Sequence, residues 1–364
     1  MRSPEITPEE QTTLAALESR LGHLHVRQRL GLERDHEAQI FRRGTHFVHI
    51  ENWYSMHGLM RATLRLAGLH ARGRRNALAI EVRRHEVTLP NLPSAFDGFT
   101  ILHLSDLHID SSHAFVDALT ERVGPLDYDL CVLTGDYRTR TFGPFAQTLA
   151  GLEKLRLHIK GDPYAVLGNH DTLRLVPGME AMGYRLLLNE WTKVARGGDA
   201  IYLSGIDDAH YYRMENFHRA AHDIPHGAVS ILLSHTPEVY RHAAHANYDL
   251  MLCGHTHGGQ ICLPGGIPVL TDADSPRSIA RGAWRYHEMI GYTSVGAGTS
   301  IVDVRLNCAP EITLHRVRRA AGIPQYGRSR IFRRNSSCDS RTASNTNAPT
   351  STMISSEFRP RRDW

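Results

Sequence analysis

Short apolar runs recur along residues 97–318, and each is followed by polar or turn-forming residues. Apolar runs of about four to eight residues with such boundaries are typical of buried strands. We therefore predict strands at residues 100–104, 130–134, 164–167, 201–205, 229–234 and 250–253. The segments between these strands have helical character, and this alternation indicates an α/β domain built around a layered sheet.

Residues 1–90 follow a mainly helical pattern. Thr7, Pro8 and Glu10 have the spacing of a capping box at a helix N-terminus. Apolar side chains then recur at helical spacing, at Leu14, Leu17, Leu21 and Leu24. Residues 77–93 predict a strand that ends at a proline.

Residues 51–75 form a second helical stretch that mixes apolar and basic side chains. Its apolar members are Trp53, Tyr54, Met56, Leu59, Met60, Leu64, Leu66 and Leu69, and its arginines are Arg61, Arg65, Arg72, Arg74 and Arg75. A basic amphipathic helix with an aromatic end suits a membrane interface. The alternative is a helix that packs its apolar face on the rest of the protein.

Composition changes again after residue 320, where Ser, Thr, Asn and Arg dominate. Such a segment has too few apolar side chains to form a core, so we predict a disordered tail. The predicted organisation is a basic helical extension at 1–90, an α/β domain at 91–320 and a disordered tail at 321–364.

Charge and hydropathy narrow the class of protein. The net charge of +4 is uneven, because both terminal segments are basic and the middle is acidic. An acidic central domain argues against a specific nucleic-acid partner. The sequence lacks a run near the roughly 18 apolar residues of a membrane span. Cys131 and Cys253 lie in apolar runs and suit reduced core thiols. We expect a cytoplasmic protein that at most lies on the inner face of the cell membrane.

The predicted strands end in the same kind of chemistry. Asp106 and His108 follow the strand at 100–104, and Asp136 follows the strand at 130–134. Asn169, His170 and Asp171 follow the strand at 164–167. His235 follows the strand at 229–234, and His255 and His257 follow the strand at 250–253. Loops at the carboxyl ends of strands share one edge of a sheet, so these side chains should converge. Histidines and carboxylates bind Zn, Mn and Fe ions, and the lack of cysteine ligands disfavours a closed structural zinc site.

The motifs SDLH, GNHD and GHTHGGQI resemble those of the calcineurin-like metallophosphoesterases, over roughly residues 97–318. The resemblance implies a four-layer α/β/β/α sandwich and a metal-dependent hydrolase of phosphoric esters. It also implies two divalent transition-metal ions (Mn, Fe or Zn, with Mn favoured). One ion would be held by Asp106, His108 and His257, and the other by Asn169, His235 and His255, while Asp136 would bridge them.

The same resemblance implies a mechanism. Hydroxide generated at the two ions would attack a phosphate ester or diphosphate in line. His170 would stabilise or protonate the leaving oxygen, and Asp171 would orient His170.

The substrate is open at this stage. Tyr137, Arg138, Asp208 and His210 are candidate substrate contacts because they lie in loops near the expected metal edge, although loop packing is the alternative. Residues 263–278 form a Gly/Pro-rich segment that could cover the site. We expect a phosphorylated small molecule or a lipid. One branch of the family cleaves the diphosphate of UDP-diacylglucosamine, which the basic N-terminal helix would suit. A nuclease or a non-catalytic scaffold is a weaker hypothesis, since the middle is acidic and every ligand position is filled.

Overall fold

A computed structural model describes residues 8–42, 58, 60–269 and 271–320. The first of its two large sheets has six strands in the order β1-β14-β2-β3-β4-β5. Their bounds are β1 Glu81–Leu89, β2 Thr100–Leu104, β3 Leu130–Leu133, β4 Tyr164–Ala165, β5 Arg185–Leu186 and β14 Glu311–Arg319. Strands β2 to β5 run parallel, and β14 pairs with β2 antiparallel and with β1 parallel.

The second large sheet has the order β12-β13-β9-β8-β7-β6. Its strands are β6 Glu190–Arg196, β7 Asp199–Gly205, β8 Ser230–Leu233, β9 Leu250–Cys253, β12 Gly282–Tyr286 and β13 Met289–Thr293. Strands β7, β8, β9 and β13 are parallel, and antiparallel hairpins with β6 and β12 close the two edges. A separate small hairpin joins β10 Cys262–Leu263 to β11 Ile267–Pro268.

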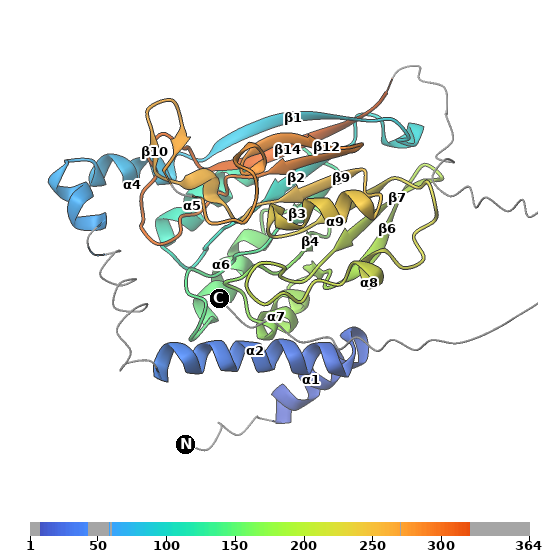
Figure 1. The fold of residues 1–364 in the computed structure, drawn as a ribbon, viewed down its shortest axis with the longest axis horizontal. Coiled ribbons are helices and arrows are strands. Elements are labelled where there is room, and N and C mark those ends of the chain that lie inside the picture. The colour runs from blue at the N-terminus through green and yellow to red at the C-terminus, as the bar shows by residue number, and fades with distance from the viewer. Residues whose placement is uncertain (1–7, 43–57, 59, 270, 321–364) are drawn as a thin grey trace, which may run out of the picture. The chain divides into compact units, whose positions relative to one another are not determined.

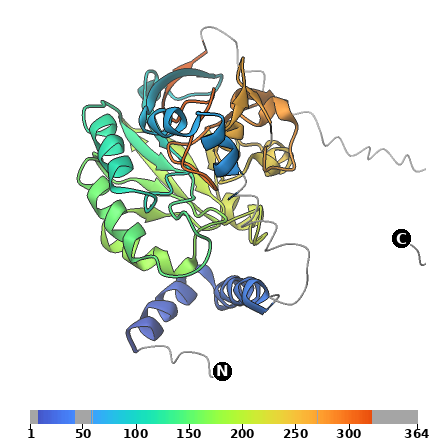
Figure 2. The ribbon, with the colours of Figure 1, turned by 90° about the vertical axis from the view of Figure 1, so that its left-hand side faces the viewer.

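Three apolar clusters define the layers. One lies between the sheets and contains Ile101 and Val132 from the first sheet with Ile231 and Leu252 from the second. Another packs the outer face of the first sheet against α5 His113–Val123, α6 Ala146–Arg156 and α7 Val176–Ala181. The third packs the outer face of the second sheet against α8 Phe217–Ala221 and α9 Tyr240–His245. Figures 1 and 2 show these helices on opposite sides of the paired sheets. The predicted α/β/β/α sandwich is confirmed.

Before β1, the N-terminal extension contains the helices α1 Pro8–Leu21, α2 His23–Arg42 and α4 His70–Leu78. Leu17 and Leu21 of α1 and Val26 of α2 join the cluster on the outer face of the first sheet. Figure 1 shows α2 running beneath α7. These two helices are thus part of the same compact unit as both sheets.

Strand β1 ties the end of the N-terminal extension to the first sheet. Strand β1, assigned above to the extension, pairs with β14 along nine residues from Glu81 to Leu89. An edge formed by main-chain hydrogen bonds makes β1 an integral strand of the first sheet. The predicted disordered tail at 321–364 lies outside the described residues.

The stretch predicted as an interfacial helix is described only in part, because Trp53, Tyr54 and Met56 lie outside the described residues. Residues 60–66 are helical, and Leu64 packs with Val302 and Val304. Within the part of the chain that the structure covers, no helix combines the length and apolar character needed to cross a membrane.

The remaining short turns are 3₁₀ segments, at η1 Ser94–Phe96, η2 Leu173–Leu175, η3 Pro237–Val239, η4 His257–Gly259 and η5 Arg277–Ile279. Of these, η4 begins at the candidate ligand His257, and η2 follows the candidate site residues Asn169, His170 and Asp171. Each begins next to a threonine side chain that accepts a backbone N–H, Thr172 from Arg174 and Thr256 from Gly258. Such caps fix tight turns at the ends of strands.

Candidate metal centre

The candidate ligands lie on loops that follow the strands of both sheets. Asp106 and His108 follow β2, Asp136 follows β3, and His255 and His257 follow β9. These five residues have positive φ angles, from 40° at His108 to 72° at His255. Non-glycine residues rarely occupy this region, and its cost is tolerated where a functional geometry requires it. The concentration of such residues marks this edge as the functional one.

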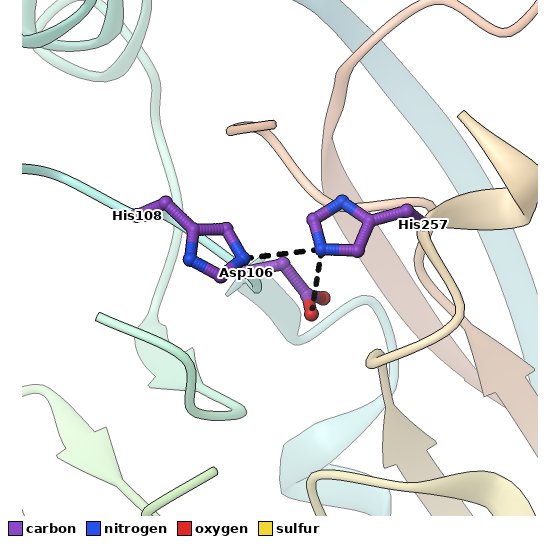
Figure 3. Close-up of side chains that lie close together, drawn as sticks. All are labelled: Asp106, His108 and His257. Atoms are coloured by element: carbon purple, nitrogen blue, oxygen red, sulfur yellow. Dashed lines mark hydrogen bonds and ion pairs between the residues drawn. The ribbon is translucent and has the colours of Figure 1, made fainter. Parts of the chain in front are cut away.

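Asp106, His108 and His257 form a first buried group whose ligand atoms lie within 4.8 Å of one another. His108 Nε2 is 3.1 Å from His257 Nε2, and His257 Nε2 is 3.6 Å from Asp106 Oδ1. Figure 3 shows both rings turned toward each other above the carboxylate. Ser105 Oγ and the His255 backbone N–H donate to Asp106 and fix its orientation.

Asp136, His235 and His255 form a second buried group of the same size. His235 Nε2 lies 3.1 Å from His255 Nδ1 and 2.9 Å from Asn169 Oδ1. The amide oxygen of Asn169 therefore faces the same point as the two imidazoles. The structure therefore brings Asn169, His235 and His255 together.

Asp136 lies between the two groups. Its Oδ1 accepts the backbone N–H of His170 at 2.9 Å. Its Oδ2 faces the centre, 3.4 Å from His235 Nε2 and 3.9 Å from His108 Nε2. Oδ2 of Asp136 is therefore the oxygen that both ligand groups can share, and the hydrogen bond to Oδ1 fixes its position.

Two histidines are held in one tautomer by backbone carbonyls. His108 Nδ1 donates to Arg138 O at 2.5 Å, and His235 Nδ1 donates to Thr134 O at 2.8 Å. In the neutral ring, the lone pair then lies on Nε2, which faces the centre. This is how metal-binding histidines are commonly oriented.

Burial and charge set the protonation states. Burial lowers the pKa of His108 to about 4 and holds the pKa values of His255 and His257 well below the usual value. Burial also lowers the pKa of His235, but the Asp136 carboxylate overrides this and raises it to about 10. The charge of His235 in turn keeps the pKa of Asp136 well below its usual value, although burial opposes this. A cation bound at the centre would replace that proton on His235.

These donors fit metal ions. Two nitrogens that each lie about 2.1 Å from one ion, at a right angle, are about 3 Å apart. The His108–His257 and His235–His255 nitrogen pairs are both separated by 3.1 Å. His255 Nε2 is buried and has no hydrogen-bond partner among the residues that the structure covers. Nitrogen and oxygen donors without a thiolate suit Mn, Fe or Zn.

Glycines allow the loops to approach this closely. A Cβ atom on Gly254 would lie 1.9 Å from Ser105 Oγ and 2.3 Å from Asp106 Oδ2. A Cβ atom on Gly168 would lie 2.3 Å from Asp136 Oδ1. Gly258, with φ of 57°, lets the turn after His257 close against Val295. A larger residue at Gly254 or Gly168 would therefore collide with a candidate ligand.

His170 lies beside the centre rather than in either ligand group. Its Nε2 is 4.0 Å from Asp136 Oδ2, and its side chain is 22% exposed. Its Nδ1 is 3.2 Å from Thr141 Oγ1. The ring thus has one nitrogen near the reacting region and the other held by a hydroxyl.

The predicted contact between Asp171 and the His170 ring is not what the structure shows. Asp171 is fully buried and accepts the backbone N–H groups of Asp136, Tyr137 and Gly168. It therefore fixes the loops that carry Asp136 and Asn169. Thr141 takes the place predicted for Asp171 beside the ring.

The candidate substrate contacts separate into two kinds. Tyr137 is fully buried and donates its hydroxyl to Val166 O, and Asp208 is buried and accepts the N–H groups of Tyr211 and Tyr212. Both side chains are thus committed to loop packing, which is the alternative given above, and their contact with substrate stays a prediction.

His210 and Arg138 lie beside candidate ligands, His210 next to His255 and Arg138 next to His108. The His210 ring lies 4.2 Å from that of His255, and its Nδ1 is 2.9 Å from Glu238 Oε1. Arg138 is buried, and its two terminal nitrogens donate to Thr141 O and Gly143 O. The segment 263–278 approaches this side as well, since Asp274 N–H donates to Glu238.

Two supporting arginines were not found from the sequence. Arg305 is fully buried, its Nη2 lies 3.2 Å from His257 Nδ1, and the same group donates to Val295 O and Gly298 O. Arg29 of α2 is also fully buried and donates to Asp171 O and Glu33. Neither arginine lies in a recognisable motif, so no local signal identifies it.

Residues 99–259 match the family described as calcineurin-like phosphoesterase. Over these residues the chain is similar to members of this family. Metallophosphoesterase YkoQ of Bacillus subtilis (strain 168) is 29% identical over 253 residues, which cover 67% of this chain and 92% of YkoQ. Phosphodiesterase YaeI of Escherichia coli (strain K12) is 28% identical over 230 residues, which cover 59% of this chain and 81% of YaeI.

A third relative is UDP-2,3-diacylglucosamine pyrophosphatase LpxG of Chlamydia trachomatis serovar D. It is 25% identical over 288 residues, which cover 62% of this chain and 86% of LpxG. The family consists of hydrolases of phosphoric esters with a dinuclear metal site, and this chain supplies two candidate ligand groups for such a site. The prediction of a metal-dependent phosphoric ester hydrolase is confirmed.

Proposed function

We propose that this hydrolase is a phosphodiesterase with two manganese ions. Asp106, His108 and His257 would hold one ion. The other would be held by Asn169, His235 and His255. Asp136 Oδ2 would bridge the ions, and its position between His108 and His235 is the observation that carries the proposal.

When bound, the two ions would withdraw charge from the phosphate oxygens and lower the pKa of a water molecule between them. The residues of the chain have distinct tasks in this reaction. Asp106 and Asp136 offset the positive charge of the ions in a buried centre. His170, whose side chain is 22% exposed and whose Nε2 faces the centre 4.0 Å from Asp136 Oδ2, donates a proton to the leaving oxygen. Thr141 holds the other nitrogen of His170 in place.

An activity screen tests this proposal. The purified, manganese-loaded protein should hydrolyse bis(p-nitrophenyl) phosphate faster than p-nitrophenyl phosphate. Asp136→Asn should abolish both activities, because it weakens the oxygen shared by the two groups. Preference for the monoester, or full activity of Asp136→Asn, would contradict the proposal.

A second candidate function is a lipid-linked diphosphatase that acts on UDP-diacylglucosamine at a membrane surface. The relative LpxG carries this activity in its name. Exposed apolar side chains also favour it, because Leu66 is 90% exposed and Leu263 and Ile267 are more than half exposed. Arg61 and Arg65 are exposed on the same helical segment as Leu66. Each basic residue near an anionic surface contributes about 1 kcal/mol of binding.

Liposome sedimentation separates the two candidates. The protein should pellet with anionic liposomes at low salt and be released at high salt. Leu66→Ser with Ile267→Ser should reduce pelleting, whereas Leu157→Ser, at an exposed leucine after α6, should not. Failure of the wild type to pellet at any salt would argue against the membrane-surface substrate. It would also show that residues 60–66 serve to pack Leu64 on Val304.

A further inference from the structure

Two cysteines lie together behind the turn that carries the candidate ligand His257. Cys262 begins β10, and Cys308 lies in the loop before β14. Their side chains pack with Val295 in a small buried cluster. The backbone N–H of Cys262 donates to Leu306 O at 2.8 Å, so the two chain segments run side by side. We call Cys262 and Cys308 the cysteine pair.

Both thiols of the cysteine pair contact the backbone of the same turn. Cys262 Sγ donates to Gly258 O at 3.3 Å, and Cys308 Sγ lies 3.8 Å from the same oxygen. Cys308 Sγ also lies 3.5 Å from His257 O. Two thiols that reach one oxygen are neighbours. Burial, and after it the thiol of Cys308, accordingly raises the pKa of Cys262 to about 11.

The cysteine pair lies closer to the surface than the other described cysteines. Cys262 and Cys308 are 5% and 8% exposed, whereas Cys131 in β3 and Cys253 in β9 are 1% and 0% exposed. The residue after Cys262 is Leu263, which is 54% exposed. A small oxidant therefore has a short path to the pair.

A buried positive charge lies beside one of the two thiols. Arg305 is fully buried, and its Nη1 is 3.9 Å from Cys308 Sγ. A neighbouring guanidinium favours the thiolate, which is the form that reacts with oxidants. Cys308 is therefore the thiol that reacts first, and Cys262 is the one that completes a disulfide.

We propose that Cys262 and Cys308 form a reversible oxidation site, and that their disulfide weakens the binding of the first metal ion at His257. The oxidant is a peroxide. The Cys308 sulfur bonds to one oxygen of hydrogen peroxide while the O–O bond breaks, which gives a sulfenic acid and hydroxide. The Cys262 sulfur then bonds to Cys308 Sγ while the S–O bond breaks and a second hydroxide leaves. Each hydroxide takes up the proton of one thiol, so two thiols are oxidised and one peroxide is reduced to two waters.

The disulfide would act on His257 through the backbone of its turn. A disulfide has no S–H group, so the contacts to His257 O and Gly258 O would be lost. The new bond would also draw residues 262 and 308 together. Loss of groups that orient a metal-binding histidine typically weakens metal binding or activity about 10–100-fold. The effect on activity rests on the proposed function, whereas formation of the disulfide does not.

Peroxide treatment of the manganese-loaded full chain tests this proposal, with catalase added to end the reaction. Thiols counted in the denatured protein should fall by two from the five in the sequence. Mass spectrometry should place the bond between Cys262 and Cys308. The Kd for manganese should rise about 10–100-fold, and hydrolysis of bis(p-nitrophenyl) phosphate at limiting manganese should slow accordingly. Dithiothreitol should reverse all three changes.

Serine variants provide the controls. Cys262→Ser and Cys308→Ser each keep a hydroxyl that can donate to the turn, so each should keep the basal rate and resist peroxide. Either variant is sufficient for this comparison. Cys338→Ser, at a position outside the described residues, is the matched control and should lose two thiols and respond to peroxide as the wild type does.

The outcomes separate the oxidation site from the proposed function. No loss of thiols, or a bond between other cysteines, would overturn the site. A Cys262–Cys308 disulfide with an unchanged Kd for manganese would overturn its link to the metal centre. Equal inactivation of the wild type and both serine variants would place the damage elsewhere and overturn the proposal too. A wild type that hydrolyses no phosphodiester would refute the proposed function, while thiol counts and manganese binding would still decide the oxidation site.

Discussion

At the scale of single residues, backbone strain accompanies the chemistry of the centre. Asp106, Asp136 and His255 have φ angles of 51°, 56° and 72°. Each such residue destabilises the fold by about 1–3 kcal/mol, so this backbone conformation is kept only where surrounding interactions hold it in place. The hydrogen bonds from His255 N–H to Asp106 and from His170 N–H to Asp136 are two of the interactions that hold it.

The neighbours Asn169 and His170 should separate metal binding from proton transfer. His170→Ala should keep both ions and lower kcat by about 10²–10⁴-fold, the usual contribution of a positioned acid. Asn169→Ala should instead weaken the second ion, because its amide oxygen faces His235. Elemental analysis and kcat measured on the same preparations check this pair. Loss of metal from His170→Ala would refute the assignment.

Residue chemistry could be predicted where it lies in a local motif. Asp106, His108, His255 and His257 sit in short strand-end sequences, and the structure brings them to one place. Arg305 could not be predicted, because it approaches His257 from 48 positions away in the chain. The burial of Tyr137 could not be predicted, since a polar residue after a strand end gives no sign of whether its side chain points into the core.

At the scale of elements, α2 supports the catalytic loops. Arg29 donates to Glu33 and to Asp171 O, lies 3.5 Å from Asp207, and stacks 3.4 Å from the centre of the Tyr212 ring. Glu33 in turn accepts from Thr172 and Leu173 at the start of η2. The helix thus holds the segment that follows His170.

Removing Arg29 should therefore destabilise the protein. Arg29→Ala leaves the buried Glu33 carboxylate without the guanidinium that lies 2.7 Å away. It also leaves Asp207, which is 1% exposed, with His25 as its remaining cationic partner. Breaking a buried ion pair on one side costs about 3–5 kcal/mol. Thermal unfolding should show a clearly lower Tm, whereas Arg27→Ala on the exposed side of α2 should leave Tm nearly unchanged. Equal Tm values for the two variants would mean that α2 is dispensable for the fold.

The sequence pattern identified the strands that are continuous apolar runs better than the strands with exposed or charged residues. The segments 100–104 and 250–253 coincide with β2 and β9, because both strands are continuous apolar runs. Strands β6, β12 and β14 were not predicted, since β6 and β12 lie at sheet edges with mostly part-exposed residues and β14 carries several arginines. The role of α2 was missed because its buried Arg29 and Glu33 resemble the charges of an exposed helix face.

At the scale of the whole molecule, three histidines join the strands β1, β2 and β14. His103 and His315 are fully buried, with His103 Nδ1 3.3 Å from His315 Nε2, and His85 Nδ1 is 3.1 Å from His315 Nδ1. Burial lowers the pKa of His103 to about 3 and also lowers the pKa values of His85 and His315. Tyr292 of β13 packs against this cluster from the second sheet.

This cluster predicts acid sensitivity. Below the ordinary pKa of 6.5, the unfolded chain takes up a proton at His103 that the folded protein excludes. The contribution of the neutral His103 to the free energy of unfolding is therefore fully present above that pH. It is lost as the pH falls toward 3, by about 1.4 kcal/mol per pH unit for one such group. The free energy of unfolding, measured with urea at pH 7.5 and at pH 4.5, should fall in both proteins. The fall should be smaller in His103→Leu than in the wild type, and the difference between the two falls should be about 3 kcal/mol. Equal losses in the two proteins would contradict this role.

The most direct test of the dinuclear centre is the anomalous scattering of a crystal grown with manganese. Two manganese peaks about 3.5–4 Å apart are expected. They should lie on either side of Asp136 Oδ2, one among Asp106, His108 and His257 and the other among Asn169, His235 and His255. A single peak, or peaks away from Asp136, would contradict the account of this site.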